Sequence, residues 1–354
     1  MVRLLDEPRP VREGEELNAA RLEAWLKEAL SNGDGAFDIS QFPSGFSNLT
    51  YLVRYGDQEL VLRRPPVGSK VKSAHDMGRE YRVLSALHPV YPPAPRPLAY
   101  CDDPEIIGAP FYVMERIQGV ILRGKKPDGF ACTPDLARRC CDVFVDNFTR
   151  LHDVDYTAIG LGDLRREGSF TRRQVDGWIN RYRGSQTDDI PAIEQLAAYL
   201  EDNCPEDTDA VFIHNDYKFD NIVLDPDDLT RIIGVLDWEM CTIGDPLMDL
   251  GVALSYWNEP KDISLGIVPC FLTLEDGCMT RQEVVNAYGD RTGRDVSTIM
   301  FYYIFGLLKL AVIAQQIYYR YKQGLTKDKR FAPLIMVVGA LGMTGVKALD
   351  TGEL

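Results

Sequence analysis

The chain has 354 residues, of which 45% are apolar and 26% charged, and its formal net charge is −14. These values are ordinary for a globular protein that buries one large core or two lobes. The acidic balance excludes a general nucleic-acid binder, which would need a basic surface, so we expect no nucleic-acid partner.

Eight cysteines and four histidines are scattered along the chain, and no two cysteines form a C-x-x-C pair. This spacing does not match a zinc site and indicates reduced thiols, so we expect a cytoplasmic protein. Acidic residues and Pro follow the first five residues at once, which predicts that no signal peptide is present. The longest apolar run, over 299–319, is interrupted by Lys309 and contains two Gln and several Tyr. It predicts a buried helix rather than a membrane span, so no membrane contact is expected.

The first predicted element is a helix that Asn18 caps and that runs through Leu30, because apolar residues recur there at helical spacing. Three strands are predicted next, over 37–42, 49–55 and 59–64. Together they form a β-meander.

Further elements follow the meander. A helix is predicted over 76–87, and the Pro-rich stretch 88–97 bars a helix after it. Residues 111–119 predict a strand that ends at a Gly, and a long helix is expected from Thr133 or Pro134 to 154. The remaining predicted helices cover 190–203, 246–257, 280–292 and 296–322, and an apolar segment covers 331–349.

The most informative stretch is 213–237, with the sequence IHNDYKFDNIVLDPDDLTRIIGVLD. Its short β-branched segments predict two strands, over 222–224 and 231–236. The Asp-Pro-Asp-Asp sequence between them is typical of a turn. A hairpin is therefore predicted, with a loop on either side.

Three polar residues flank this hairpin. Asp216 and Asn221 precede it and Asp237 follows it, so the hairpin brings all three to the same end. Carboxylate and amide oxygens are the ligands that Mg²⁺ prefers. The step of five residues from Asp216 to Asn221, followed by an Asp after a further strand, is also that of the protein-kinase catalytic centre.

Together with GDPLMDLGVAL at 244–254, the stretch resembles the aminoglycoside phosphotransferase and choline kinase family. Asn215 and Asp220 stand where that family usually has Gly. In this respect the sequence is most similar to the kinase-like domains fused to acyl-CoA dehydrogenases. The resemblance covers roughly residues 35–345, and its most specific part is 213–254.

The resemblance implies an α+β, bilobal protein-kinase-like fold. A small antiparallel-sheet N-lobe is expected at 1–117, with a hinge strand at its end. A larger, mainly helical C-lobe is expected at 118–354, with the catalytic and metal-binding loops.

In such a fold the N-lobe binds ATP. Arg63 stands where the family has the lysine that contacts the α- and β-phosphates, and strand alternation separates it from Arg64. Glu80 is expected to orient Arg63, although alone it could be one of several solvated charges on a helix. The remaining nucleotide candidates are Ser44, Gly45, Ser47 and Asn48 in the PSGFSN loop, and Met114, Glu115 and Ile117 at the hinge. Without the downstream motif, PSGFSN would be an ordinary turn and Met114 a core residue.

The resemblance also assigns the chemistry, which is transfer of the ATP γ-phosphoryl group to an alcohol. Asp216 would accept the hydroxyl proton, Lys218 would balance charge, and Asn221 with Asp237 would hold Mg²⁺. His214 and Asp249 would support the loop geometry. Glu239 is an additional metal or substrate candidate.

The acceptor is a small molecule whose class the sequence leaves open. Residues 160–184 carry six Arg interleaved with aromatic residues, and the stretch is either a solvated face or a site for an anionic acceptor, such as a hydroxyacyl compound. Arg172, Arg173 and Trp178 are the substrate candidates. Aminoglycoside- or choline-like acceptors remain open. A non-catalytic nucleotide-binding module and a metal-dependent phosphohydrolase are the rival functions.

Overall fold

The computed structural model describes residues 7–30, 35–42, 48–66, 76–124, 126–127, 129–262, 270–326 and 328–354. The chain separates into two compact units. A sheet-rich unit contains Arg3–Ile121 and Ile222–Glu239, and a helical unit contains Leu122–Asn221 and Met240–Leu354. An α+β fold with a small antiparallel sheet and a larger, mainly helical part is therefore confirmed.

The sheet-rich unit is built on five antiparallel strands in the order β1-β2-β3-β5-β4. Their bounds are β1 Phe37–Gln41, β2 Leu49–Tyr55, β3 Gln58–Arg64, β4 Pro97–Cys101 and β5 Phe111–Glu115. The meander and the hinge strand agree with the sequence. β4 has no counterpart among the predicted strands, because nearby prolines interrupt its short apolar pattern.

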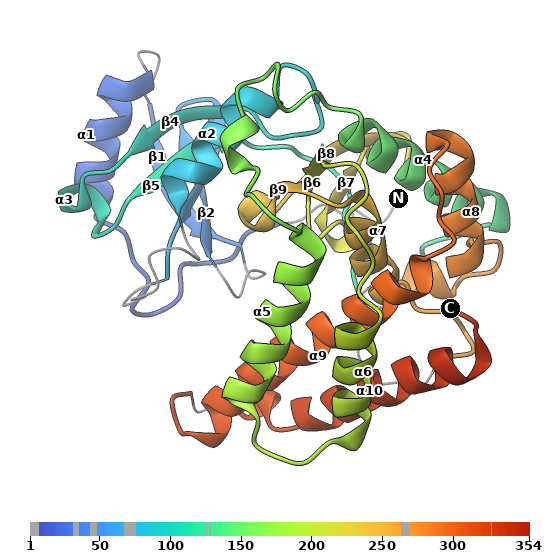
Figure 1. Ribbon diagram of the computed structural model, residues 1–354. Coiled ribbons are helices and arrows are strands. Elements are labelled where there is room, and N and C mark those ends of the chain that lie inside the picture. The colour runs from blue at the N-terminus through green and yellow to red at the C-terminus, as the bar shows by residue number, and fades with distance from the viewer. Residues whose placement is uncertain are drawn as a thin grey trace. The chain divides into compact units, whose positions relative to one another are not determined.

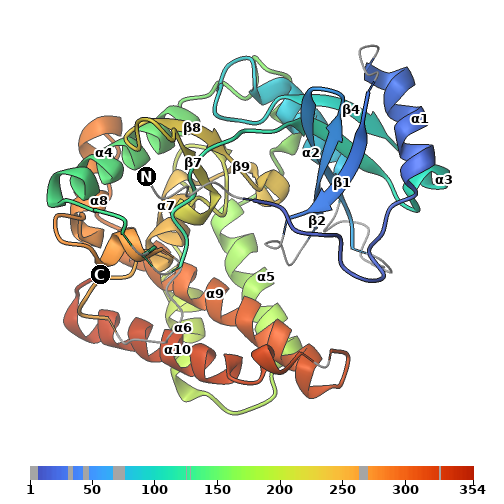
Figure 2. The same ribbon diagram turned by 180° about the vertical axis from the view of Figure 1, so that it is seen from behind.

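Helices cover both faces of this sheet. α1 (Ala19–Leu30) and α2 (Met77–Leu87) lie on opposite faces, as Figures 1 and 2 show, and a short helix α3 covers Pro104–Ile107. Asn18 accepts a hydrogen bond from the Arg21 N–H at 3.1 Å, as expected of a cap. The core between α1 and the sheet includes Leu22, Leu26, Tyr51, Leu60, Leu62 and Phe111. Because side chains alternate along a strand, Arg63 faces away from this core, toward α2.

The hairpin of β7 (Ile222–Leu224) and β8 (Ile232–Val235) groups with the sheet-rich unit. Val120 and Leu224 exchange backbone hydrogen bonds, and the Val235 N–H donates to the Pro93 carbonyl. These bonds explain why the division differs from the expected continuous lobe at 118–354. Ile222 pairs with Val235, so the flanking segments leave the hairpin at the same end.

The helical unit contains seven long helices among its described residues. They are α4 Pro134–His152, α5 Phe170–Ser185, α6 Pro191–Asp202, α7 Pro246–Ser255, α8 Arg281–Thr292, α9 Ile299–Lys322 and α10 Leu334–Thr351. Two short strands, β6 (Val211–Ile213) and β9 (Thr242–Gly244), pair antiparallel. β6 leads directly into the loop that carries Asp216.

Helices α7 and α9 cross at closely packed glycines. A Cβ added at Gly251 would lie 2.2 Å from the Tyr302 carbonyl oxygen, and one added at Gly306 would lie 2.4 Å from the Gly251 carbonyl oxygen. Only glycine allows the two backbones to approach this closely. Asp249 on α7 and Lys309 on α9 are both buried in this part of the helical unit.

Two described segments are long and apolar enough to cross a membrane. One is α9, in which 78% of the apolar window is buried inside the protein, as predicted for a core helix. The other is Lys329–Thr351, which ends in α10 and has 33% of its window buried. Two such helices are weak evidence of a span, because core helices have the same length and composition.

Candidate active site

In the sheet-rich unit, Arg63 is the centre of a buried cluster of charges. Its Nη2 lies 2.9 Å from Asp237 Oδ1 and 3.7 Å from Glu239 Oε2, and its Nε lies 3.4 Å from Glu80 Oε2. The expected pairing of Arg63 with Glu80 is thus present. The neighbouring Arg64 instead donates to the Ile107 carbonyl at 2.7 Å, which separates the two arginines as strand alternation predicts.

Neutral side chains complete this cluster. Asn48 donates from Nδ2 to Glu239 Oε2 at 2.7 Å and to Glu80 Oε1 at 3.3 Å. Tyr112, which is opposite Arg63 in the β3–β5 register, donates its hydroxyl to Glu80 Oε2 at 2.9 Å. Tyr112 is not among the site residues predicted from the sequence. The alternation of side chains along β5 could have identified it, because Tyr112 lies on the same face of the strand as Met114.

Burial and opposite charges set the electrostatics of the cluster. Burial raises the pKa of Glu80, even though the Arg63 guanidinium opposes this. Burial alone would lower the pKa of Arg63, but Glu80, Tyr112 and the two other acids raise it well above its usual value. Arg63 therefore remains a cation at any physiological pH.

Asp237 has a strained backbone and a partly exposed carboxylate. Its φ is +68°, in the left-handed region that non-glycine residues rarely occupy. The Trp238 indole N–H donates to the Val235 carbonyl at 2.7 Å and anchors the turn. The side chain of Asp237 is 35% exposed, so its carboxylate can receive a ligand.

In the helical unit, Asp249 holds the loop that follows β6. Its carboxylate accepts from the backbone N–H groups of His214 and Asn215, each at 2.7 Å. His152 contacts Asp249 through Nε2 at 3.2 Å and the Tyr288 hydroxyl through Nδ1 at 2.8 Å. Although burial would raise the pKa of Asp249, these donors lower it. Asp249 thus binds the backbone of this loop at two successive residues.

His214 also supports the loop directly. The Asp216 backbone N–H donates to His214 Nδ1 at 3.2 Å, which requires that this ring nitrogen be deprotonated. His214 is fully buried. It therefore orders the loop from inside and does not face a substrate.

The Asp216 carboxylate is held by two neighbours. Lys218 Nζ lies 3.1 Å from Oδ1 and 3.0 Å from Oδ2. Asn221 donates from Nδ2 to Asp216 Oδ2 and to the Asp216 carbonyl, each at 2.9 Å. Because the amide nitrogen of Asn221 is engaged, its amide oxygen is left for another ligand.

Asp220 occupies the position where the resembled family usually has Gly. Burial raises its pKa to about 6, against the opposing charges of Lys218 and Arg123. Its Oδ1 is buried and has no hydrogen-bond partner among the described residues. A carboxyl that accepts a proton near neutral pH therefore stands next to Asn221.

The structure describes only part of the expected nucleotide site. Ser44, Gly45 and Ser47 lie outside the described residues. Met114 is 6% exposed, and the Glu115 N–H donates to the Arg96 carbonyl at 3.0 Å. The Ile117 N–H has no backbone hydrogen-bond partner among the described residues. The adenine-binding roles of these residues stay predictions.

The metal candidates do not form a protein-only cage. No group of three or more His, Cys, Asp or Glu suited to a metal is found among the described residues. Magnesium does not require one, because it keeps several waters and often takes one or two protein oxygens together with phosphate. Asn221 and Asp237 each carry an oxygen of the kind that Mg²⁺ prefers, and their roles as magnesium ligands stay predictions.

The expected substrate residues do not form one site. Arg172 donates to the Glu201 carbonyl at 3.0 Å, and Arg173 donates to the Glu167 and Gly168 carbonyls at 2.5 and 2.7 Å. Trp178 is 7% exposed and lies elsewhere on α5. Arg172 is thus a structural residue, and Trp178 is largely a core residue.

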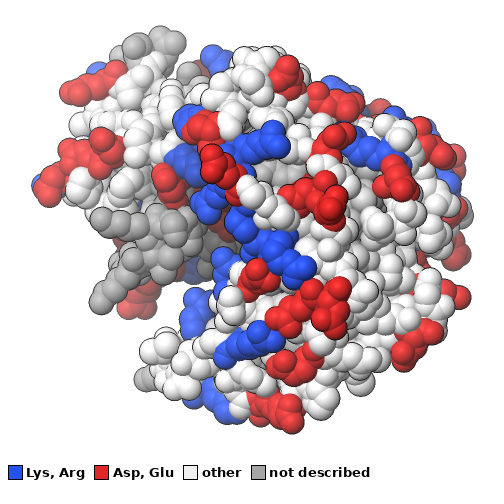
Figure 3. All heavy atoms as spheres, in the orientation of Figure 1, with Lys and Arg blue, Asp and Glu red and all other residues white. Residues whose placement is uncertain are grey.

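Other arginines of the basic stretch are exposed. Lys and Arg side chains gather on the surface over α5 (Figure 3). Among the described residues, the side chains of Arg165, Arg166 and Arg181 have no hydrogen-bond or ion-pair partner, whereas Arg183 pairs with Glu201 at 3.3 Å. The Arg181 guanidinium lies 4.7 Å from the centre of the Trp178 ring.

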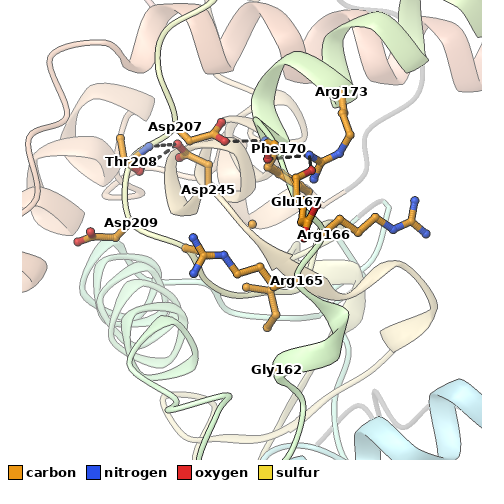
Figure 4. Close-up of a pocket in the computed structure, with 14 residues that line it drawn as sticks. Gly162, Arg165, Arg166, Glu167, Phe170, Arg173, Asp207, Thr208, Asp209 and Asp245 are labelled. Carbon is orange, nitrogen blue, oxygen red and sulfur yellow. Dashed lines mark hydrogen bonds between the residues drawn. The ribbon is translucent and has the colours of Figure 1, made fainter.

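A pocket of about 410 Å³ lies beside the N-terminal part of α5. Arg165 and Arg166 are among its lining residues, and Figure 4 shows their side chains extending in opposite directions. Two acids in its wall already have several donors. Asp207 accepts from the Phe170 and Thr171 N–H groups, and Asp245 accepts from Thr208 and Leu247. Among the described residues that line the pocket, Arg165 and Arg166 are thus the cations without a hydrogen-bond or ion-pair partner.

Comparison with known proteins supports the same fold. Residues 38–289 match the phosphotransferase enzyme family. The chain is 34% identical over 333 residues to acyl-CoA dehydrogenase family member 11 of Rattus norvegicus, covering 92% of this chain and 42% of that protein. The chain therefore spans less than half the length of this curated relative.

Solved structures show the architecture. A Ralstonia eutropha protein provisionally named an aminoglycoside phosphotransferase is 29% identical, with a TM-score of 0.79 over 95% of this chain and 99% of that one. A thermostable mutant of aminoglycoside phosphotransferase APH(4)-Ia, bound to AMP-PNP and hygromycin B, is 14% identical, with a TM-score of 0.60 over 93% and 99%. The bilobal, protein-kinase-like fold class is thereby confirmed.

Proposed function

Because the chain belongs to the phosphotransferase enzyme family, we propose that it is a kinase that transfers the γ-phosphoryl group of ATP to a small-molecule hydroxyl. The observation that carries this proposal is the ordered loop after β6. There the Asp216 carboxylate is held by Lys218 and Asn221, on a backbone that Asp249 fixes. A hydrogen-bonded carboxylate next to a lysine is what phosphoryl transfer to an alcohol needs.

Each residue has a distinct role in this reaction. Asp216 accepts a hydrogen bond from the acceptor hydroxyl and takes its proton as the bond to phosphorus forms. Lys218 offers its ammonium to the phosphoryl oxygens, which carry the transferred negative charge. Arg63 binds the α- and β-phosphates, because a guanidinium can donate two parallel hydrogen bonds to phosphate.

Magnesium would be bound together with ATP. The amide oxygen of Asn221 and the carboxylate of Asp237 are the proposed protein ligands, and both are oxygens of the kind that Mg²⁺ prefers. When bound, Mg²⁺ neutralises charge on the phosphates. Asn221 has a second function in this chain, because its Nδ2 orients the Asp216 carboxylate.

The proposed acceptor carries an anionic group as well as the hydroxyl. Support comes from the exposed arginines of the basic stretch that lack a partner in the described chain, which are Arg165, Arg166 and Arg181. Stacking on Trp178 keeps Arg181 in a defined place without neutralising its charge. A cationic acceptor would instead require unpartnered acids there. A hydroxyacyl thioester that bears phosphate groups has the required charge.

The acceptor is testable with a matched set of arginine variants. Initial rates would be measured with aminoglycosides, choline, sugars and hydroxyacyl thioesters. Arg181→Ala and the double variant Arg165→Ala/Arg166→Ala should raise KM for an anionic acceptor about tenfold, because each removes a charged hydrogen-bond donor. Arg183→Ala is the control, since Arg183 already pairs with Glu201. A preference for cationic acceptors would refute this part of the proposal.

The kinase reaction itself is tested by Asp216→Asn. This variant should bind MgATP as the unaltered protein does and lose transfer by about 10²- to 10⁴-fold, the usual contribution of a general base. Equal turnover by both proteins would rule out Asp216 as the base. ATP consumption without any acceptor would favour a phosphohydrolase. Tight MgATP binding with no turnover on the whole panel would favour a non-catalytic module.

A further inference from the structure

A buried lysine contacts the catalytic loop from the protein interior. Lys309 on α9 is 2% exposed, and its Nζ donates to the Asn215 carbonyl at 2.6 Å. Asn215 immediately precedes Asp216 and has a φ of +66°, in the left-handed region. A non-glycine residue persists there only when its surroundings hold it.

The contacts of Asn215 show how it is held. Its N–H donates to Asp249 Oδ1 at 2.7 Å, and its side chain donates from Nδ2 to the Met240 carbonyl at 3.0 Å. Lys309 supplies the remaining contact, on the carbonyl oxygen. The backbone N–H, the backbone carbonyl and the side-chain Nδ2 of Asn215 therefore each have a hydrogen-bond partner.

Stability alone does not explain a lysine at this position. The surrounding part of α9 is apolar and buried, and among the described residues the Lys309 ammonium forms no ion pair. Burial lowers the pKa of Lys309 to about 8, although the charges of Asp216 and Asp249 oppose this. A methionine of similar length would avoid the desolvation of a charge.

We propose that Lys309 is a positioning residue for phosphoryl transfer, whose ammonium holds the Asn215 carbonyl and thereby sets the orientation of the Asp216 carboxylate. This inference rests on the proposed kinase function. The Trp178 ring, whose centre lies 5.7 Å from Nζ, covers the ammonium and helps to exclude water. Lys309 does not touch a substrate, so it acts only through the loop.

The same helix offers a matched control. Gln315 on α9 is 1% exposed and donates from Nε2 to the Ser185 carbonyl at 2.7 Å and to Thr187 Oγ1 at 2.9 Å. It is thus a buried donor to a backbone carbonyl that does not belong to the catalytic loop. Gln315→Leu should reproduce the general effect of losing a buried hydrogen bond on α9.

The test compares Lys309→Met and Lys309→Gln with Gln315→Leu in the full chain. We expect kcat to fall about 10- to 100-fold in Lys309→Met, the range that follows from a misplaced reacting group, with KM for ATP within about twofold. Lys309→Gln should recover part of kcat, because its amide can donate to the same carbonyl. Gln315→Leu should leave kcat within about twofold of the unaltered protein.

The pH profile of kcat is a second test of the role of Lys309. Lys309 loses its charge as pH rises through about 8, so kcat of the unaltered protein should fall there, and this fall should be absent in Lys309→Met. The ionisable groups that act on the ammonium are Asp216 and Lys218 on the loop, Asp249 on α7 and Arg181 on α5. Lys309→Met leaves all of these other ionisable groups in place.

Backbone hydrogen exchange separates this inference from the kinase proposal, because it needs no turnover. Amide exchange over residues 214–217 should be faster in Lys309→Met and unchanged in Gln315→Leu. Equal losses of kcat in both variants, an unchanged pH profile, or unchanged exchange in the loop would overturn the inference. Failure of both Lys309 variants to fold would also overturn it, because Lys309 would then act in stability.

Discussion

Arg63 donates from Nη2 to Oδ1 of Asp237 at 2.9 Å, which joins the end of β3 to the segment that follows β8. Both residues are expected to meet the phosphates of ATP, one directly and the other through magnesium. Each residue thereby satisfies the charge of the other. Binding of MgATP would replace this internal pair with contacts to phosphate and metal.

The cluster around Arg63 predicts two separate effects of mutation. Arg63→Met leaves buried acids without their cation, so the free energy of unfolding should fall by about 3–5 kcal/mol. Arg63→Lys keeps the charge but loses the planar donor pair. It should lower stability less and raise KM for ATP by roughly tenfold or less, about the loss of one charge-assisted hydrogen bond. Urea denaturation and steady-state kinetics would measure both.

Arg64 provides the control for this prediction. It is adjacent, similarly buried and bonded to the Ile107 carbonyl rather than to an acid. Arg64→Met should lower stability without changing the affinity for MgATP. If Arg64→Met weakened nucleotide binding as much as Arg63→Met, the assignment of Arg63 to the phosphates would be wrong.

Asp220 predicts a stability that depends on pH. Its pKa in the folded protein is about 6, above its ordinary value near 3.8, so the folded protein binds more protons between these values than the unfolded chain. The contribution of Asp220 is therefore most favourable below about pH 4 and is lost as pH rises to about 6. The loss is at most about 3 kcal/mol.

Asp220→Asn removes this titration. Its denaturation midpoint, measured without nucleotide, should exceed that of the unaltered protein at pH 7 and approach it at pH 4. The difference between the two proteins should develop over pH 4–6. A constant difference at every pH would contradict the buried state of this carboxyl.

Lys309 predicts the opposite pH dependence. Its pKa falls from 10.5 to about 8 on folding, so the unfolded chain binds more protons between these values and stability rises with pH in that window. The size is roughly 3 kcal/mol. Lys309→Met should lack this rise. At pH 7 it should have nearly unaltered stability, because relief of the buried charge offsets the unsatisfied Asn215 carbonyl, which costs about 1–3 kcal/mol.

Substitution of Asn221, the proposed magnesium ligand, should impair both magnesium binding and kcat. Asn221→Ala removes a metal oxygen, so the Mg²⁺ concentration for half-maximal rate should rise about tenfold or more. It also removes the donor to Asp216, so kcat at saturating Mg²⁺ should remain low. Magnesium titration after treatment with EDTA would show both components. Recovery of full kcat at high Mg²⁺ would contradict the role of Nδ2.

Local sequence patterns predicted most of the elements that carry the site. The alternation of β3 separated Arg63 from Arg64, and the Asp-Pro turn with its β-branched flanks predicted the β7–β8 hairpin. The family resemblance implied that Asp249 supports the loop, and Asp249 accepts hydrogen bonds from two backbone N–H groups there. The strand alternation and the hairpin depend on neighbours within a few residues. The role of Asp249 depends on a motif whose spacing is distinctive.

The sequence by itself thus predicted the chemistry, because Asp216, Asn221 and Asp237 lie at a distinctive spacing within one short stretch. Only the tertiary structure decided which distant side chains support that stretch. Lys309 appeared in the sequence merely as a charge within an apolar run, and Tyr112 as one residue of a strand. Their roles depend on the crossing of α9 with α7 and on the pairing of β3 with β5. Contacts between segments so far apart in the chain are set by packing, which local patterns do not encode.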